Sequence, residues 1–595
     1  MSEQESKEKG KPRELVYAEQ LIDENKYTEA IQVFTELGKK ENISLYYKVL
    51  CLYLQSRILF WVGKYGDCLK TAEQAYKESL KLGKNLLTVD CLNVMIMVLG
   101  FSLGGYDRAS ELMNKAENLF KAIPKESSAE YKYTEGGLNL FKGNFFSEDD
   151  FNRKLKYLEH SLTLWEEIDA KQQKAITVLC IGNSLCYIKG EIEQAITYID
   201  RGLAIAKEIN FKYGIAVILY SLANAYNFKG EIDRALIYFK QSLKLLREIN
   251  NKPHMAIILN CIGTVYSVKG EFDHALENLE ESLAIFEEIE ITQWTLHPLA
   301  SGVEISLERG DIERAQQYFQ RFEQINEQFH PPERNWSRLL KAMILKKSSR
   351  TRNKAKAEEL LKQIVEEEGV GFELTLNALI HICDLLREEL RITKDMEVLD
   401  ELNTYIGQLL DYAEKSNSYW ILCEVYLLQA KLALLELDMK TAQRFLTQAQ
   451  QIAERFGLNQ LATQIANENK DLLEKLDLWE KLKEVGAPMA DRLELAHLDE
   501  QIEGMVQKRA ALTAKVTEEK IAISKEKKVC LVCRGEVLRF SYICECGAIY
   551  CENCARALTN LENVCWACDV QIDYSKPIKL FKEEEVEVEE KAKKK

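Results

Sequence analysis

Eight of the 16 cysteines in this chain crowd between residues 530 and 568, where they form four close pairs. Thiolates are soft ligands that suit Zn²⁺, which takes four of them in a tetrahedron. Two cysteines close together in sequence form a tight knuckle that supplies two ligands from one side of a metal. No histidine lies in this stretch, so we expect two Cys₄ zinc sites built from cysteine alone. The pairs are Cys530 with Cys533, Cys544 with Cys546, Cys551 with Cys554, and Cys565 with Cys568.

Other uses of clustered cysteines fit the chain less well. Disulfides need an oxidising compartment, and the polar residues Met1–Glu14 are not a signal peptide. A single zinc ion and an iron–sulfur cluster stay open as alternatives, although paired knuckles over so short a stretch favour two zinc ions. A module of this size has little apolar core, so metal binding should drive its folding.

The order of the pairs resembles that of cross-brace zinc modules, in particular RING fingers whose ligands are all cysteine. The resemblance implies that the first and third pairs share one ion and that the second and fourth pairs share the other. A sequential, ribbon-like pairing is the alternative. The two implied ligand sets are Cys530, Cys533, Cys551 and Cys554, and Cys544, Cys546, Cys565 and Cys568.

RING fingers recruit a ubiquitin-conjugating enzyme through apolar residues beside the first and third knuckles. The residues in corresponding places here are Val532, Leu558 and Trp566. Two positions depart from the ligase pattern, because Trp566 stands where proline is usual and Asp569 stands where many ligases have a basic residue. The resemblance therefore implies either a ligase or a module that only contacts another protein.

A forty-residue period precedes the cysteines. Its clearest markers are four glycines followed five residues later by alanine. With weaker copies on both sides, we count about ten or eleven units across residues 15–457, each of which reads as a pair of helices with one apolar stripe per helix. The glycine ends the first helix, and the small alanine allows the two helices to approach closely. The glycines are Gly190, Gly230, Gly270 and Gly310, and the alanines are Ala195, Ala235, Ala275 and Ala315.

Residues 222–243 and 262–283 resemble the tetratricopeptide repeat (TPR) pattern, with a unit longer than the usual ~34 residues. The resemblance implies an all-α solenoid whose first helices line a concave groove. Asn183 and Asn224 follow the small residue of their first helices and would point into that groove. A side-chain amide there can hold the backbone of an extended peptide; in the alternative interpretation, both amides are solvated or cap neighbouring groups.

The repeat fades over residues 458–528, which we expect to be a helical linker. Apolar residues at heptad spacing run through 495–516, either as a helix that packs back on the array or as the seam of a dimeric coiled coil. We expect the zinc module to occupy residues 529–575, with disorder in residues 1–14 and in the charged tail 576–595. The heptad residues are Leu495, Leu498, Ile502, Met505, Leu512 and Val516.

Composition limits the function further. The 595 residues include only 8 prolines and 28 glycines, which suits stacked helices, and the net charge is −15. An acidic chain does not favour nucleic acid or an anionic membrane, and the module itself holds three arginines against four glutamates. We therefore expect a cytoplasmic chain that binds protein or peptide partners and neither nucleic acid nor membrane.

Catalytic signatures such as GxxxxGK[ST], GxGxxG, HExxH and GxSxG are absent from the sequence. Three hypotheses follow. The chain is a scaffold without catalysis of its own, or a RING-type ubiquitin-like ligase with the array as its substrate receptor, or a TPR regulator whose zinc module is only a structural cap.

Overall fold

The computed structural model describes two compact units, each considered by itself. The first comprises Met1–Ile392, Glu397–Ser418 and Ile502–Ile521, and the second Thr393–Met396, Tyr419–Gln501 and Ala522–Lys595. The described residues are 11–83, 85–102, 105–145, 151–186, 192–229, 231–328, 334–367, 370, 372–415, 419–456, 458–513, 530–535, 537, 540–544, 546–559, 563–571 and 578–579.

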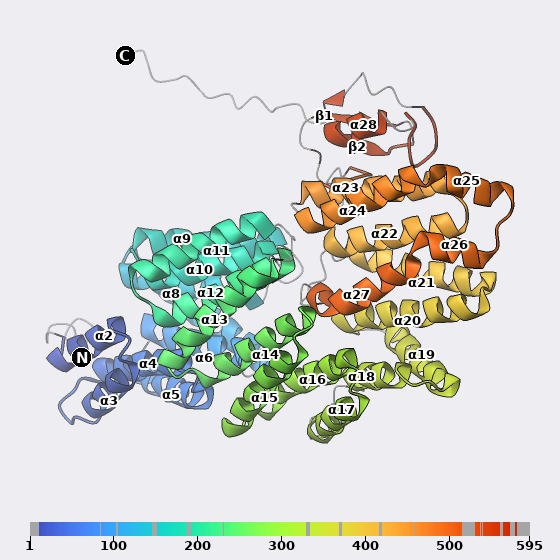
Figure 1. The fold of residues 1–595 in the computed structure, drawn as a ribbon. Helices are drawn as coiled ribbons and strands as arrows, with labels where there is room; N and C mark the ends of the chain where they lie inside the picture. The colour runs from blue at the N-terminus through green and yellow to red at the C-terminus, as the bar shows by residue number, and fades with distance from the viewer. Residues whose placement is uncertain are drawn as a thin grey trace, which may run out of the picture. The chain divides into compact units, whose positions relative to one another are not determined.

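The first unit is a stack of antiparallel helix pairs (Figure 1). Among the residues described, ten pairs belong to this unit and one more to the second unit, so the predicted all-α solenoid of ten or eleven pairs is confirmed. The first helices are α2 (Arg13–Asp23), α4 (Leu45–Trp61), α6 (Leu86–Phe101), α8 (Ala129–Phe145), α10 (Lys171–Ser184), α12 (Lys212–Lys229), α14 (Lys252–Val268), α16 (Leu296–Arg309), α18 (Arg334–Lys346), α20 (Phe372–Thr393) and α22 (Tyr419–Leu435).

The second helix of each pair follows a short turn, and two short 3₁₀ helices, η1 (Leu80–Leu82) and η3 (Thr292–Thr295), join pairs. The second helices are α3 (Tyr27–Gly38), α5 (Tyr65–Ser79), α7 (Tyr106–Lys121), α9 (Phe151–Glu167), α11 (Ile192–Glu208), α13 (Ile232–Glu248), α15 (Phe272–Glu288), α17 (Ile312–Asn326), α19 (Thr351–Glu366), α21 (Met396–Lys415) and α23 (Met439–Arg455).

Small residues bring the two helices of a pair together, as the sequence predicts. The repeated alanines Ala235 and Ala275 are fully buried. A Cβ added at Gly263 of α14 would lie 2.9 Å from the Ala275 carbonyl oxygen of α15. A serine on the second helix then ties the pair, since Ser282 Oγ donates to the carbonyl of Ala256 at 2.7 Å. These close contacts require small residues, and small residues recur at these positions every forty residues along the chain.

Residues with left-handed backbone conformation recur at two places, in the turns within pairs and in the linkers between pairs. Gly270 and Gly310 end α14 and α16 at φ of 75° and 85°, a left-handed conformation that glycine adopts without strain. The equivalent Gly190 and Gly230 lie outside the described residues. A second left-handed position, which the sequence analysis does not identify, recurs in the linkers about forty residues apart. It is filled by Asp169, Asn210, Asn250 and Glu290, with φ between 49° and 56°.

First helices form the inner side of the first unit. Successive first helices contact one another, as α4 does with α6, α6 with α8, and α14 with α16. Within the described part of the chain, no two successive second helices make as much contact with each other as these first helices do. In a curved stack the inner elements lie closest together, so this pattern places the first helices on the concave face.

The first two pairs also contact linkers much further along the chain, and we call this set of contacts the clasp. In the turn between α2 and α3, Asn25 Nδ2 donates to the Asn210 carbonyl at 2.7 Å and Asn25 Oδ1 accepts from the Lys212 N–H at 3.1 Å. Between α13 and α14, the fully buried Asn251 donates from Nδ2 to the carbonyl of Trp61 at 2.9 Å. The same kind of turn thus meets the same kind of linker twice.

Aromatic side chains fill the clasp. The rings of Trp61 and Phe211 meet edge to face with centroids 5.2 Å apart, and the Tyr65 hydroxyl is hydrogen-bonded to His254 Nδ1 at 2.9 Å. Burial lowers the pKa of His254 to about 4, so this imidazole is neutral near pH 7. The clasp is therefore an uncharged, well-packed contact between turns about 190 residues apart.

The second unit holds α22 and α23, the helices that follow them as far as Gln501, and the cysteine module. Among the described residues, the module has a three-stranded antiparallel sheet in the order β2-β1-β3 and one helix. The elements after α23 are α24 (Asn459–Glu474), α25 (Leu476–Glu484), α26 (Met489–Ala496), α27 (Leu498–Thr513), β1 (Phe540–Ile543), β2 (Ile549–Cys551), α28 (Glu552–Thr559) and β3 (Ile578–Lys579).

Helices occupy much of the segment 458–528, for which a helical linker was expected. Leu498, Ile502 and Met505, three of the predicted heptad residues, are buried within the single chain. Helix α2 begins inside the segment 1–14 that was expected to be disordered. Residues 1–10, Val516 and most of the tail 576–595 lie outside the described residues. Of the helices described, none has the length and apolar character needed to cross a membrane.

Candidate functional site

The hairpin of β1 and β2 brings the third cysteine pair to the first. Tyr542 pairs with Tyr550 across the hairpin, and the Leu531 N–H donates to the Ile549 carbonyl at 2.7 Å. Helix α28 begins directly after Cys551, which places Cys554 in its first turn. The four sulfur atoms lie within 4.8 Å of one another, and all four residues are buried. They are Cys530, Cys533, Cys551 and Cys554.

The second and fourth pairs meet at the other end of the module. Cys544 and Cys546 flank the turn after β1, where the Cys544 N–H donates to the Ala548 carbonyl at 2.9 Å. Cys565 and Cys568 lie in the turn after α28. Their four sulfur atoms also lie within 4.8 Å of one another, and this quartet is the more exposed of the two.

Both quartets have the dimensions of a tetrahedral zinc site. With Zn–S bonds of about 2.3 Å, the sulfur atoms of such a site are about 3.8 Å apart. The measured Sγ–Sγ distances are 3.7 Å between Cys533 and Cys551, 3.5 Å between Cys544 and Cys568, and 3.6 Å between Cys546 and Cys565. The donor set is entirely soft, and four protein ligands leave no open position. The residues therefore fit a structural metal ion in each quartet.

Hydrogen bonds to sulfur favour the thiolate form that a metal requires. The Cys551 N–H donates to Cys530 Sγ at 3.3 Å, and the Tyr550 hydroxyl lies 3.1 Å from Cys565 Sγ. The hydrogen bond between Cys530 and Cys533 lowers the pKa of Cys533 to about 7 and raises the pKa of Cys530, so Cys533 is the first of the two to form a thiolate. Such outer contacts orient metal ligands and tune their affinity.

Helix α23 supplies a cation to the first quartet. Arg455 Nη1 donates to Cys533 Sγ at 3.2 Å and lies 3.9 Å from Cys551 Sγ. Gly535 makes this approach feasible, because a Cβ there would collide with the Arg455 guanidinium. Eleven residues earlier in the same helix, Arg444 forms an ion pair of 2.5 Å with Asp569. The last helix pair thus holds the module by polar contacts.

We expect Arg455→Gln to weaken metal binding at the first quartet about 10- to 100-fold, because the guanidinium offsets the negative charge of four thiolates. Competition with a chromophoric chelator measures the affinity of each site. Arg444→Gln is the matched control, since it removes a contact between α23 and the module without touching a sulfur atom. Equal losses in the two variants would contradict a direct role for Arg455.

The three residues proposed to contact a conjugating enzyme are placed differently from one another. Val532 and Leu558 have no exposed surface and belong to the core of the module, together with Tyr550. Trp566 is half-buried. A partner that approached this region would therefore meet Trp566 and not the other two side chains.

Asn183 and Asn224 lie on α10 and α12, the first helices of adjacent pairs, and both are half-buried. Asn183 Oδ1 is buried and has no hydrogen-bond partner among the residues described. The Asn224 side chain is hydrogen-bonded to the hydroxyl of Tyr220, one turn earlier. A buried amide oxygen without a partner among the described residues is unusual and marks Asn183 as a candidate for a polar contact.

A polar cluster on the inner face was not predicted from the sequence. The hydroxyls of Tyr53 on α4 and Tyr133 on α8 are 3.4 Å apart, although these helices are two pairs apart, and Gln173 Nε2 of α10 donates to Tyr133 at 2.8 Å. Burial raises the pKa of Asp90 on α6 to about 7, against the opposing effects of Thr134 and Arg57. The available signal was a charge inside otherwise apolar first helices, as at Arg57 and Asp90.

Comparison with known proteins identifies a family to which the repeats are similar. A family model for the MalT-like TPR region matches residues 145–477, more than half of the chain. No curated protein matches significantly. Similar solved structures include a Rap protein complexed with Competence and Sporulation Factor (14% identity, 62% of this chain and 99% of that chain, TM-score 0.46), apo NprR, a quorum sensor from B. thuringiensis (14%, 59% and 99%, 0.42), and aspartyl phosphate phosphatase F from Bacillus subtilis (13%, 60% and 92%, 0.41).

Proposed function

The chain belongs to the family of MalT-like TPR regions, and from that premise we propose that it is a protein-interaction scaffold. The inner face of the array binds segments of partner proteins, and the C-terminal module binds two Zn²⁺ ions and contacts a second protein. The observation that carries the proposal is that first helices hold half-buried polar side chains, among them Asn183, Asn224 and the hydrogen-bonded pair Tyr133 and Gln173. A row of hydrogen-bonding groups suits the repeating N–H and C=O groups of an extended peptide.

The zinc ions have a structural role in this proposal. Each would be held by four cysteine thiolates, Cys530, Cys533, Cys551 and Cys554 for one ion and the remaining quartet for the other. A bound zinc ion supplies four bonds that tie separate loops together. The cysteines themselves position the hairpin of β1 and β2 against α28, and Tyr550 and Arg455 orient the sulfur atoms. This arrangement supports a rigid contact surface.

We select a peptide that binds the chain and expect Asn183→Ala and Asn224→Ala each to lower its affinity about tenfold. Each variant loses one hydrogen bond to a backbone group of the peptide. Selection from a displayed peptide library, followed by fluorescence anisotropy, gives the affinities. Asn278→Ala on the second helix α15 is the matched control and should leave affinity unchanged. Peptides whose binding is lowered by Asn278→Ala and not by the other two variants would refute the inner-face site.

A ubiquitin-like ligase is the second candidate. The meeting of the first cysteine pair with the third, and of the second with the fourth, favours it, since cross-brace modules share this order. The burial of Val532 and Leu558 gives it less support than the scaffold. Discharge of a conjugating-enzyme thioester that the chain accelerates, and that Trp566→Ala abolishes, would favour the ligase. No acceleration with any conjugating enzyme of the host would favour the scaffold.

A further inference from the structure

Helix α26 lies on α22 within the second unit, and Gln501 at the start of α27 reaches Glu424 of α22. Ala496 and Leu498, on either side of the bend between them, are buried. Arg492 Nη1 donates to the Leu435 carbonyl at the end of α22 at 3.0 Å. The predicted linker is therefore seated on a first helix of the array.

The contact includes charged groups that are almost fully enclosed. Lys431 and Glu424 of α22 are 4% and 1% exposed. Lys431 Nζ donates to the Ala496 carbonyl at 3.1 Å and forms an ion pair of 3.0 Å with Glu468. Glu424 Oε2 accepts from Gln501 Nε2 at 2.6 Å. Enclosed polar groups bind well only to a partner that satisfies each of them, so this face is selective.

Lys431 occupies the position in its repeat that corresponds to Asn224, the predicted groove residue of an earlier repeat. It follows Ala430, which is twelve residues before the buried Ala442 of α23. Asn224 follows Ala223 in the same way, twelve residues before Ala235. The carbonyl end of α26 thus occupies in the last pair the place where an earlier pair presents a groove amide.

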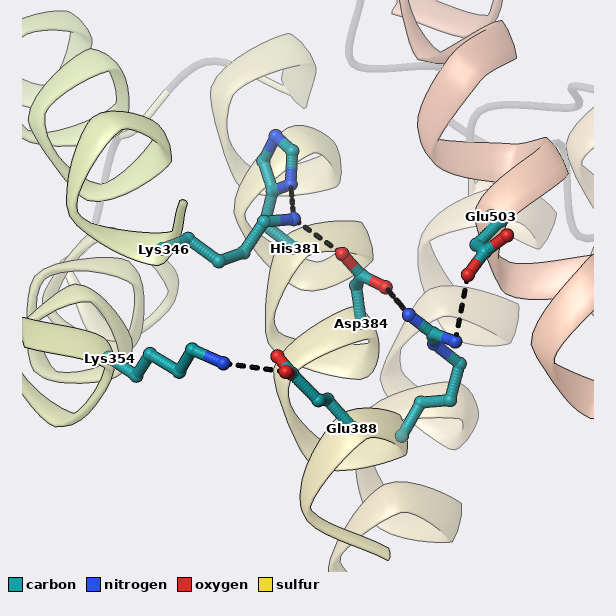
Figure 2. Close-up of polar contacts among 7 residues, drawn as sticks. Lys346, Lys354, His381, Asp384, Glu388 and Glu503 are labelled. Carbon is teal, nitrogen blue, oxygen red and sulfur yellow. Dashed lines mark hydrogen bonds and ion pairs between the residues drawn. The ribbon is translucent and has the colours of Figure 1, made fainter. Parts of the chain in front are cut away.

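The first unit holds the continuation of α27 by similar means (Figure 2). Glu503 accepts from Arg387 Nη1 at 3.1 Å, and Arg387 also donates to Asp384 at 2.8 Å. The other oxygen of Asp384 accepts from Lys346 Nζ at 2.6 Å, and Lys346 in turn lies 2.8 Å from His381 Nδ1. Arg387 belongs to α20, another first helix, so here a carboxylate of α27 meets a basic residue of a first helix, as the Ala496 carbonyl of α26 meets Lys431 in the second unit.

We propose that segment 489–501 is an internal ligand of α22, and that the face it covers takes an amphipathic partner helix of the same chemistry. Such a helix would present an apolar residue like Leu498 and an amide like that of Gln501. This inference rests on the proposed function, because it assumes that the inner face binds protein segments.

Two features make the internal ligand replaceable. The bend between α26 and α27 places His497, which is not glycine, at φ of 51°. That left-handed conformation is unfavourable for a residue with a side chain, and a continuous partner helix would not adopt it. The ion pair that follows the segment, between Arg387 and Glu503, also contributes little net stability, because the Glu503 side chain is 56% exposed and exposed ion pairs are weak. A partner must still exceed the effective concentration of a tethered segment, which is in the millimolar range for short linkers.

The test uses the full zinc-loaded chain and a fluorescent peptide with the sequence of residues 489–501. Leu498→Asp should release the internal segment without changing α22, and we expect this variant to bind the peptide at least tenfold more tightly than the unaltered chain. Adding Lys431→Met should remove the gain. Far-UV circular dichroism and metal content check folding, and the milder Gln501→Ala replaces Leu498→Asp if the latter unfolds.

Hydrogen exchange of residues 489–501 shows whether the segment has been released. Release without any gain in peptide affinity would overturn the proposal, as would equal binding to the released and unaltered chains. These outcomes are distinct from failure of the proposed function, because the Asn183 and Asn224 variants report on other pairs of the array.

Discussion

Cys530→Ser should lower the metal content from two ions to one per chain and unfold the hairpin of β1 and β2. A structural zinc site contributes roughly 10–16 kcal/mol to folding at neutral pH, far more than a core this small can replace. Because the sulfur atoms of Cys530 and Cys551 belong to one quartet, Cys551→Ser should remove the same ion. Cys565→Ser should remove the other ion. Metal analysis and hydrogen exchange over residues 540–551 measure both effects.

The pattern of losses also tests how the pairs combine. If the pairs bound metal sequentially, Cys530→Ser and Cys551→Ser would each leave a different ion in place, and the double variant would lose both. We expect the double variant to retain one. Cys423→Ser is the control, since Cys423 is fully buried in α22 with its sulfur 3.4 Å from the Ala449 carbonyl, and a serine can make the same contact. It should leave two ions bound.

Gly263→Val should destabilise the array by about 3 kcal/mol. The new Cβ would press on the Ala275 carbonyl oxygen, and backbone of the facing helix cannot move aside as a flexible side chain could. Gly263→Ala should cost less, because alanine fills the equivalent position at Ala223. Urea unfolding followed by circular dichroism gives the loss of stability, and amide exchange in α14 and α15 locates it.

Gly407→Val provides the comparison for this substitution. Gly407 is a helical glycine of α21 with open space around its Cα, so the same change adds volume without a clash. Because other residues have a higher helix propensity than glycine, we expect Gly407→Val to be neutral or slightly stabilising. If the two valine variants lost stability equally, close packing at Gly263 would not be the cause.

The helix pairs and the cysteine quartets could be read from the sequence because both signals are local. A period of forty residues repeats its own turn and packing residues, such as Gly270 and Ala275, and each knuckle brings two ligands within a few residues. The polar cluster around Asp90 and Tyr133 could not be read in this way. Which inner side chains meet depends on the curvature of the stack, and no motif records that curvature.

The segment 458–528 shows a different limit of prediction from sequence. A heptad pattern through Leu498 and Ile502 identifies an apolar stripe but not the surface that covers it, so packing back on the array and forming a dimer seam remained alternatives. Burial of both residues within one chain favours the first. The polar partners of the segment, Glu424 and Lys431, stood in the sequence as charges inside the apolar helix α22. That anomaly was the available signal for a helix docked there.

The clasp changes how the array should unfold. A repeat protein whose units touch only their neighbours melts gradually from its ends, and its stability is nearly a sum over adjacent units. Here Asn25 and Asn251 connect turns to linkers some 190 residues apart, so the first pairs cannot fray without breaking contacts in the middle of the stack. Roughly the first seven pairs should behave as one cooperative block, and they should fold more slowly than an open array of equal length, because a long loop must close before the block is complete.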